Sequence, residues 1–534
     1  MMQHAGFCRS LGRRFIHAES RGFVLLFALG MTAGLHAAPP DSEAPRPSAT
    51  AKRLVGSTPI VPADSKMPRL PIDQEIGSKD FTVGLSFRAD DPFTTDLGDL
   101  VSLWDSASRN GFTLGLRNNT GCTSSQSNWR QLQFGLDAGT EPTWREEGRP
   151  GSALLGFALC VHRGHLYVAT CEPGKDDAGK VYRYEGPGRW KDLGRLDGAN
   201  SVTSLASFDG HLYAGTGKYR LRGSALAESE NTTVGGRIYR LSKEDRWEPA
   251  GQLGSTEAVG GLVNYGGRLY ATSLYPPAGF FRYEGGDKWT SLPTPGGKRV
   301  VALGVHGGAL YASSYDGGRV YRFDGSNWAD LGLAGEDNTQ TYSFATYLGR
   351  LQVGTWPSGK VYRLDSGDRW ADAGRLGQEH EVMGMLVHNG AFYAGSLPKA
   401  EVYRWDEAGG EGRWSLLKQL DTTPDVKYRR AWTMATYRGR MFVTTLPSGK
   451  IWSMQAGACV TDDGELGPGW HDLVAQRNGG RLRLFVDGRL SAESEPNAGA
   501  ISLTTRGREL VVGNGPRGAF PGQVRDVWFE LPKP

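Results

Sequence analysis

Three polar side chains have the types and positions needed for proton transfer: His380, Tyr342 and Glu257. An imidazole or a phenol can take a proton during a reaction, and a carboxyl group can give one. Elimination at a uronate would need such a base beside a cation that neutralises the carboxylate. Hydrolysis of a glycoside would instead need two carboxyl groups about 5 to 10 Å apart, and Glu379 and Glu381 flank His380 as further candidates. These residues make an enzyme acting on polysaccharides one interpretation.

A second set of residues is suited to binding sugars rather than to reacting with them. Aromatic rings stack on the flat C–H faces of sugars, and the guanidinium fork of arginine binds carboxylate or sulfate through two hydrogen bonds. The arginines are Arg299, Arg429 and Arg430, and the aromatic residues are Tyr275, Tyr315, Trp356 and Trp432. Together they predict a site for an acidic glycan. The alternative is that these rings and arginines only cover the end of a structural scaffold.

The elements that must position these residues are copies of one repeated phrase. A short apolar strand, Gly-x-Leu-Tyr-Ala-x-Thr, recurs with variations seven times between Leu166 and Met441, at intervals of 41 to 57 residues. A second alternating strand follows each copy, beginning for example at Val320 and Val361, and then a strand with a tryptophan, except in the last copy. Another apolar stretch precedes each copy, which gives four short strands per unit. A period of this length is typical of a β-propeller blade.

The seventh unit ends at Ile451-Trp452-Ser453-Met454 without a tryptophan strand, which would leave an open sheet edge. The segment Trp144-Arg145-Glu146-Glu147-Gly148-Arg149 resembles Trp370-Ala371-Asp372-Ala373-Gly374-Arg375, the tryptophan strand of the fifth unit. We therefore expect residues 142–149 to complete the last unit and to close a seven-bladed ring. The site residues then lie in loops on one face, the mouth of the ring. A linear β-solenoid with atypical end units is the alternative.

Apolar residues also alternate outside the repeats, in two separate parts of the chain. Residues 80–136 form one part, and the other contains Trp470-His471-Asp472-Leu473-Val474-Ala475, Leu482-x-Leu484-x-Val486-Asp487-Gly488 and Asp526-Val527-Trp528-Phe529. The three later phrases resemble the second half of the laminin G, or concanavalin A-like, jelly-roll family, and residues 80–136 look like its earlier strands. The resemblance implies one sandwich interrupted by an inserted propeller. It also implies binding of glycans or proteins, sometimes through calcium.

The start of the chain is typical of an exported protein. Arg21 precedes an apolar run over residues 22–31, and the small residues Ala37 and Ala38 follow, in the order of a secretory signal peptide. We therefore expect the protein to be secreted or periplasmic. The expected all-β organisation is a signal peptide over 1–38, a flexible linker over 39–66, jelly-roll halves over 67–141 and 456–534, and a seven-bladed β-propeller over 142–455.

The overall charge excludes two classes of partner. The 534 residues carry 61 basic and 57 acidic side chains, a formal net charge of +4. So small an excess gives no strong attraction to nucleic acid or to an anionic membrane, and we expect neither. The oligomeric state is not indicated by any pattern.

Four cysteines follow the signal peptide, and an even number in an exported chain predicts disulfides. Cys160 and Cys171 bracket the first hairpin of the first unit, while Cys122 and Cys459 fall in the two halves of the sandwich. We therefore favour the pairs 160–171 and 122–459. Four free thiols are the alternative.

No cofactor follows firmly from the sequence. The carboxylates of Asp90, Asp91, Asp96 and Asp99 could coordinate calcium, although acidic residues in such loops are more often simply solvated. The function that we predict is carbohydrate recognition by an exported protein, through the jelly roll and the propeller mouth. The alternative is a secreted polysaccharide lyase or glycoside hydrolase with its site at the mouth.

Overall fold

The computed structural model describes residues 43–64, 66–118, 130–408 and 411–532. In these residues the regular structure consists of antiparallel β-strands and four short 3-10 turns, η2 (Pro62–Asp64), η3 (Leu221–Ser224), η4 (Pro295–Gly297) and η5 (Ala498–Ala500). The all-β class and the β-propeller predicted from the repeats are confirmed. Among the described residues, none of the helical turns is long and apolar enough to cross a membrane. The predicted signal peptide lies outside the described residues.

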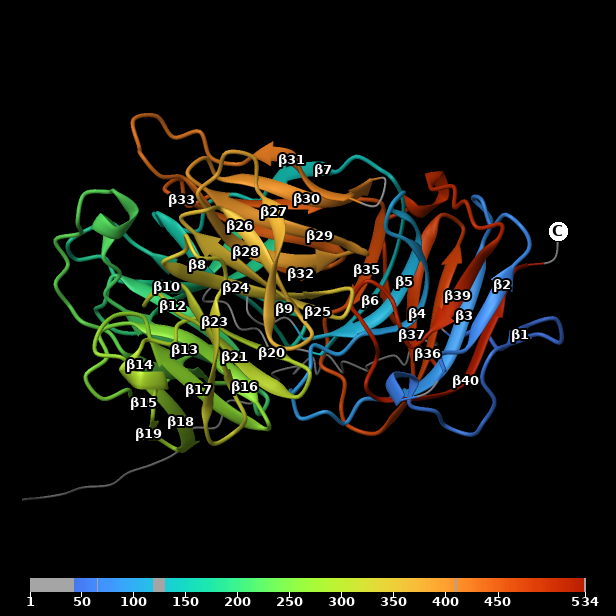
Figure 1. The fold of residues 1–534 in the computed structure, drawn as a ribbon, viewed down its shortest axis with the longest axis horizontal. Helices are drawn as coiled ribbons and strands as arrows, with labels where there is room; N and C mark the ends of the chain where they lie inside the picture. The colour runs from blue at the N-terminus through green and yellow to red at the C-terminus, as the bar shows by residue number, and fades with distance from the viewer. Residues whose placement is uncertain (1–42, 65, 119–129, 409–410, 533–534) are drawn as a thin grey trace, which may run out of the picture. The chain divides into compact units, whose positions relative to one another are not determined.

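Two six-stranded sheets are built from both ends of the described chain, and each contains early strands, blue to cyan in Figure 1, and late strands, red in Figure 1. The first sheet has the order β1 (Lys52–Arg53), β40 (Gln523–Glu530), β3 (Phe81–Arg88), β36 (Trp470–Asn478), β37 (Arg481–Val486) and β38 (Arg489–Glu493). The second has the order β2 (Arg69–Ile72), β39 (Arg508–Val512), β4 (Asp99–Asp105), β5 (Asn110–Arg117), β6 (Gln131–Ala138) and β35 (Ala458–Asp462).

These two sheets share one apolar core, and we call them the sandwich. Phe81 of β3 lies 4.9 Å from Phe112 of β5 between ring centroids, and 6.0 Å from Phe529 of β40. Leu473 and Leu484, from the later part of the chain, belong to the same buried cluster. Since each end of the chain supplies only part of this core, the sandwich requires both ends to meet.

The residues between them form seven groups of four strands within the described chain, drawn from teal to orange in Figure 1, and we call each group a sheet. The first two groups are joined by the pairing of Cys171 with Ser201. From the innermost strand outward, the first sheet is β8 (Leu155–His162), β9 (His165–Cys171), β10 (Lys180–Gly186) and β11 (Arg189–Arg195), the second is β12 (Ser201–Phe208), β13 (His211–Gly217), β14 (Arg237–Leu241) and β15 (Trp247–Gln252), and the third is β16 (Val259–Tyr265), β17 (Arg268–Ser273), β18 (Phe280–Gly285) and β19 (Lys288–Leu292). The fourth is β20 (Leu303–His306), β21 (Ala309–Ser313), β22 (Arg319–Phe323) and β23 (Trp328–Leu333), and the fifth is β24 (Gln340–Tyr347), β25 (Arg350–Trp356), β26 (Lys360–Asp365) and β27 (Arg369–Arg375). The sixth is β28 (Glu381–His388), β29 (Ala391–Leu397), β30 (Glu401–Ala408) and β31 (Glu411–Gln419), and the seventh is β32 (Arg430–Tyr437), β33 (Arg440–Leu446), β34 (Ile451–Gln455) and β7 (Thr143–Glu146).

The repeated tryptophans hold neighbouring sheets of this ring together. Each innermost strand packs beside the next one, and β32 packs beside β8, so the ring is closed. In five sheets the indole Nε1 of the outermost strand donates to a carbonyl at the outer edge of the preceding sheet, with N···O distances of 2.8 to 3.1 Å. The donors are Trp190, Trp289, Trp328, Trp370 and Trp414. A residue common to the units therefore has a packing role.

The last sheet is completed by the early strand, as expected from its tryptophan. Met454 of β34 pairs with Trp144 of β7, and Ser453 pairs with Arg145. The indole of Trp190 in the first sheet then donates to the carbonyl of Glu147 at 2.8 Å. This contact joins the first and last sheets in the same way as the other neighbours.

Asn389 lies at the tip of the β28–β29 hairpin. It donates hydrogen bonds to both segments of the chain that pass between the ring and the sandwich. Its Nδ2 donates to the carbonyls of Leu136, at 3.1 Å, and of Ala456, at 2.8 Å. Asn389 is 1% exposed and has a positive φ of 45°, which an asparagine adopts more readily than most residues. Gly457, in the segment that returns to the sandwich, has φ 65°, and a Cβ there would lie 2.2 Å from the Leu136 carbonyl oxygen. The crossing is therefore closely packed.

A buried carboxyl group, Asp463, also joins sandwich and ring. It accepts hydrogen bonds from Gln131 Nε2 at 2.5 Å and from the backbone N–H of Arg438, in the last sheet, at 3.0 Å. Its own carbonyl accepts from the N–H of Gly164 in the first sheet at 3.0 Å. Burial raises the pKa of Asp463 to about 6, although these donors favour the charged form.

The predicted disulfide between Cys160 and Cys171 is wrong. Both residues are buried free thiols. Cys160 pairs with Tyr167, whereas Cys171 pairs with Leu155, four residues further along β9. At about 3.3 Å per residue the two Cα atoms are too far apart for a disulfide. Cys459 is also a free, buried thiol, which contradicts the second predicted pair, and its predicted partner Cys122 lies outside the described residues.

Part of the stretch predicted as a flexible linker is bound to the sandwich. Lys52 and Arg53 form β1, which pairs with Phe529 and Trp528 of β40. The N–H of Leu54 then donates to the carbonyl of Val527 at 2.8 Å. Because β40 has an available edge, this short segment takes up its hydrogen bonds instead of remaining a spacer.

Replacement of Asn389 by Gly should lower the free energy of unfolding by about 2 to 4 kcal/mol, because buried carbonyls lose their donor. Glycine keeps the positive φ, so the loss measures the side chain. Denaturant unfolding measures the effect. Asp209→Gly is the matched control: Asp209 occupies the same turn position at φ 46° in the second sheet and is exposed. Equal effects of the two substitutions would contradict the role of Asn389.

The stability contribution of Asp463 should fall as pH rises. A carboxyl whose pKa is about 6 when folded and 3.8 when unfolded favours folding fully only below 3.8, and this advantage is lost as pH rises to 6. The free energy of unfolding, relative to Asp463→Asn, should therefore decrease by about 3 kcal/mol between pH 3.8 and pH 7. Urea titrations of both proteins across this range measure it. A difference that is constant with pH would refute the prediction.

Candidate functional site

The innermost strands begin at one end of the ring, and we call this end the mouth. Six of these strands have a register shift against their neighbour at the same place near the start. Such a bulge leaves a residue outside the regular pairing and redirects its side chain. Phe157, Tyr342, Met383 and Trp432 stand at these shifts, and Phe157, Met383 and Trp432 meet in one buried cluster although they come from different sheets.

A charged pair lies within this apolar surrounding. Arg430 is the first residue of β32 and Glu381 the first residue of β28, and Arg430 Nε lies 3.9 Å from Glu381 Oε2. Their side chains are 8% and 2% exposed. The guanidinium carbon lies 5.7 Å from the ring centroids of both Trp432 and Tyr428. The arginine is thus held by a carboxyl group and by aromatic faces.

Several hydrogen-bonding atoms of this pair have no partner among the described residues. They are Glu381 Oε1 and the Nε and Nη1 atoms of Arg430. Buried polar atoms in this state are costly, since each has lost its water. A ligand with hydroxyl groups, or water, would satisfy them.

The buried pair also changes the ionisation of its neighbourhood. Burial raises the pKa of the Glu381 carboxyl, and Arg430 and Tyr342 offset part of that rise. Burial and the nearby Glu381 hold the pKa of Tyr342 well above its usual value. The Tyr342 hydroxyl donates to Gln340 Oε1 at 2.5 Å. A phenol in this state is a poor base at neutral pH.

Partly exposed rings stand nearer the rim. Trp356 lies 6.2 Å from both His380 and Tyr428 between ring centroids, and His380 is exposed. The ammonium group of Lys427 lies 4.9 Å from the Tyr428 centroid. Tyr315 packs against Tyr342 at 5.0 Å. These contacts bring together predicted residues from the fourth to the seventh sheets.

Other predicted residues are already occupied by partners within the chain. Arg299 Nη2 lies 2.7 Å from Asp316 Oδ1. Glu257 is paired with Arg220 at 2.6 Å, and the guanidinium of Arg220 also lies 4.5 Å from the Tyr275 ring.

The remaining two candidates have structural partners as well. Arg429 Nε donates to the carbonyl of Thr423 at 2.7 Å. Glu379 Oε2 accepts from Ser396 Oγ at 2.8 Å and from the N–H of Lys399 at 3.0 Å. Neither Glu257 nor Glu379 is therefore placed as a free second carboxyl for hydrolysis.

Sequence reasoning missed one contributor to the buried cluster, Phe157. Phe157 lies 5.0 Å from both Tyr219 and Trp432 between ring centroids. Phe157 occupies the same position in β8 that Trp432 has in β32, and alignment of the innermost strands could have found it.

The acidic residues considered for calcium have other roles. Asp90 is paired with Arg88, and Asp91 accepts from the N–H groups of Thr94 and Thr95. Asp96 accepts from the hydroxyl of Thr346, and Asp99 is buried against Arg517 at 2.6 Å. Within the described ranges no three His, Cys, Asp or Glu side chains are grouped to hold a metal ion.

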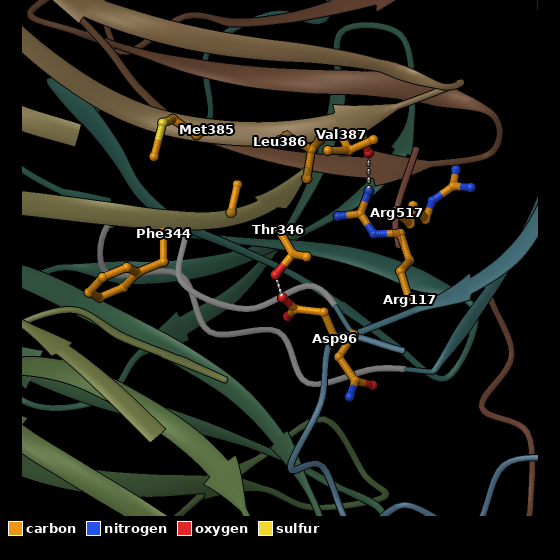
Figure 2. Close-up of a pocket in the computed structure, with 10 residues that line it drawn as sticks. Asp96, Arg117, Phe344, Thr346, Met385, Leu386, Val387 and Arg517 are labelled. Atoms are coloured by element: carbon orange, nitrogen blue, oxygen red, sulfur yellow. Dashed lines mark hydrogen bonds between the residues drawn. The ribbon is translucent and has the colours of Figure 1, made fainter. Parts of the chain in front are cut away.

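Figure 2 shows a small cavity at the opposite end of the innermost strands, where the ring meets the sandwich. Its volume is about 40 Å³. Arg117 crosses it and donates to the carbonyl of Val387 at 2.9 Å, and Asp96 and Thr346 are bonded beside it. A space of this size holds a few water molecules at most, so the mouth is the better candidate for a site.

Arg430→Met should destabilise the protein increasingly as pH rises. Methionine fills the aromatic surrounding, but Glu381 is then buried without its cation and its pKa rises further. A raised carboxyl pKa favours folding at low pH and loses this advantage as pH rises. We expect a loss of about 3 kcal/mol at pH 8 and a smaller one at pH 5, measured by urea unfolding.

Glu381→Gln is the comparison for this prediction. It leaves Arg430 buried and charged, but it also removes a carboxyl whose raised pKa makes the parent lose stability as pH rises. The cost of Glu381→Gln relative to the parent should therefore decrease with pH, opposite to that of Arg430→Met. Parallel pH profiles for the two variants would contradict the proposed pairing.

The chain matches no protein-family model and no curated protein. Among solved structures it is similar to a streptogramin B lyase, with 12% identity and a TM-score of 0.47 over 59% of this chain and 98% of that one. It is similar to a catalytically inactive virginiamycin B lyase from Staphylococcus aureus with quinupristin, with 12% identity and a TM-score of 0.46 over 59% and 99%. The WD40 β-propeller domain of Doa1 has 14% identity and a TM-score of 0.42 over 58% and 97%. Similarity at this level carries no activity over to this chain.

Proposed function

We propose that the protein is an exported carbohydrate-recognition protein, in which a seven-bladed propeller is inserted into a laminin G-like jelly roll. Its main site is the mouth of the ring. The observation that carries this proposal is the joint presence there of partly exposed rings, Trp356 and Tyr428, and of the buried pair Arg430 and Glu381 with unsatisfied polar atoms.

The chemistry of a sugar fits both parts of this site. Its C–H faces stack on the rings of Trp356 and Tyr428, and its hydroxyl groups both donate and accept hydrogen bonds. A hydroxyl that reached the pair would donate to Glu381 and accept from Arg430. Lys427 and Arg429 flank Tyr428 in the sequence, which favours a glycan carrying carboxylate or sulfate groups.

The sandwich is proposed as a second recognition surface on the basis of its family resemblance. Trp470 is partly exposed, and the guanidinium of Arg525 lies 4.3 Å from its ring. An aromatic ring with a cation over it offers stacking and a charge in one place. Export is proposed from residues 1–38, which precede the described chain.

One observation favours the enzymatic alternative, a lyase or glycoside hydrolase. Glu381 is a buried carboxyl with a raised pKa, as a general acid requires. Against this, Glu257 is held by Arg220, and the high pKa of Tyr342 makes it unsuitable as the base of an elimination. Recognition requires no second group and is therefore the function we adopt.

The full chain should bind acidic polysaccharides on a glycan array, and Trp356→Ala and Tyr428→Ala should each weaken binding about tenfold, since a stacked ring contributes about 1 kcal/mol or more. Titration calorimetry with hyaluronan, alginate and polygalacturonate measures the affinities. Tyr283→Leu, at a partly exposed ring in the third sheet, is the control and should bind as the parent does.

Two outcomes would contradict this assignment. Unchanged affinity in both ring variants would remove the mouth as the binding site. Cleavage of the same polymers, seen as new reducing ends or unsaturated uronate products and abolished by Glu381→Gln, would establish the enzymatic alternative instead.

A further inference from the structure

The hairpin of β30 and β31 departs from the other sheets, and Figure 1 shows it in orange beside β7. Its strands have eight and nine residues, whereas the corresponding strands of the other sheets have four to seven. Trp405 is the only tryptophan at its position in the repeated phrase, where the other described sheets have Tyr184, Leu241, Tyr283, Phe323, Leu364 and Met454. Features common to the units serve the packing of the ring, so a departure in one unit needs another explanation.

Trp405 lines a groove of about 340 Å³ between the fifth and sixth sheets. Between ring centroids, Trp414 lies 5.3 Å from Trp405 and 5.2 Å from Phe392, which stacks on Tyr347 at 5.1 Å. Phe392 and Tyr347 are buried, while Trp405 and Trp414 are partly exposed. The groove therefore has a fixed aromatic wall that presents indole surface to a ligand.

Polar side chains complete the lining: Arg350, Gln352, Arg363 and Glu407. Both arginines are paired with Asp365, at an N···O distance of 2.9 Å for Arg363. The two guanidinium groups, Asp365 and Glu407 have no net charge together. This lining offers donors and acceptors for hydroxyl groups, but no excess of positive charge for an acidic polymer.

The groove also lies at the opposite end of the ring from the mouth. Tyr347 ends β24, whose first residue, Gln340, is at the mouth. Tyr347 additionally interacts with Ser106 of the sandwich and with Glu407. The groove is thus beside the sandwich and independent of Arg430 and its neighbours.

We propose that this groove is a second saccharide site, which binds one or two residues of an uncharged sugar chain. The C–H face of the sugar stacks on Trp405, its hydroxyl groups donate to Glu407, and they accept from Arg350 and Arg363. The volume is in the range of small-molecule sites. This site does not rest on the function proposed for the mouth, and the two differ in the charge of the sugar that they select.

The test uses the full chain labelled with fluorotryptophan and titrated with cellohexaose, xylohexaose, chitohexaose and hexagalacturonate. Trp405→Leu identifies the fluorine resonance of Trp405 by its loss, and it places in β30 the residue that β26 and β14 already carry. We expect that resonance to shift saturably with at least one uncharged sugar. The affinity for that sugar should fall about tenfold in Trp405→Leu and remain unchanged in Tyr283→Leu, at the same repeat position in β18.

Glu407→Gln is a second variant that keeps the aromatic wall, and it should weaken binding several-fold without changing the melting temperature. The proposal is overturned if no uncharged sugar shifts the Trp405 resonance, or if both groove variants bind like the parent. Hexagalacturonate shifting this resonance more strongly than the uncharged sugars would overturn the assigned sugar class. Binding of acidic polymers at Trp356 is measured separately, so either site can fail alone.

Discussion

β7 and β34 pair through four residues, from Trp452 with Glu146 to Gln455 with Thr143. The chain enters the ring through β7 and leaves it through β34, while β6 and β35, on the sandwich side of the same crossing, also pair with each other. One antiparallel crossing therefore completes the last sheet of the ring and joins the two halves of the sandwich. The entropy cost of joining such distant segments grows only slowly with the length between them, so a short ladder supported by buried side chains is sufficient.

Glu147 connects this crossing to the first sheet of the ring. Its side chain is fully buried and accepts from Tyr184 Oη at 2.6 Å and from Ser453 Oγ at 2.5 Å. Its carbonyl accepts from the indole of Trp190, and its N–H donates to the carbonyl of Ile451 at 2.7 Å. The first and last sheets are thus fixed against each other. Because the ring is closed, the innermost strands are held at the distance at which Arg430 and Glu381 meet.

The sequence allowed the crossing to be predicted because Trp144 carries the same marker as the other outermost strands, and Tyr342 and Trp432 could be assigned to the mouth because they stand near the start of innermost strands. Other features depend on geometry that spacing does not contain. Cys160 and Cys171 are close in sequence, but strand register separates them. Arg299 looked free for a ligand until the turn after β21 placed Asp316 against it. Which of the residues at the mouth form a pair depends on the ring as a whole.

The positions that vary among the units also separate packing from recognition. At one equivalent position the innermost strands carry Leu159, Leu205, Leu262, Leu303, Phe344, Met385 or Met434, always apolar and buried. The residue two positions earlier stands at the register shift in six of these strands, as Phe157, Thr203, Gly260, Tyr342, Met383 or Trp432. The first kind packs sheet against sheet and therefore tolerates little change in volume. The side chains at the register shifts are redirected by the bulge and do not pack between sheets. Their residue types can therefore differ from unit to unit. A ring of similar sheets can in this way form an asymmetric site. The aromatic and charged residues around Arg430 form such a site, because the sheets carry different residues at equivalent positions.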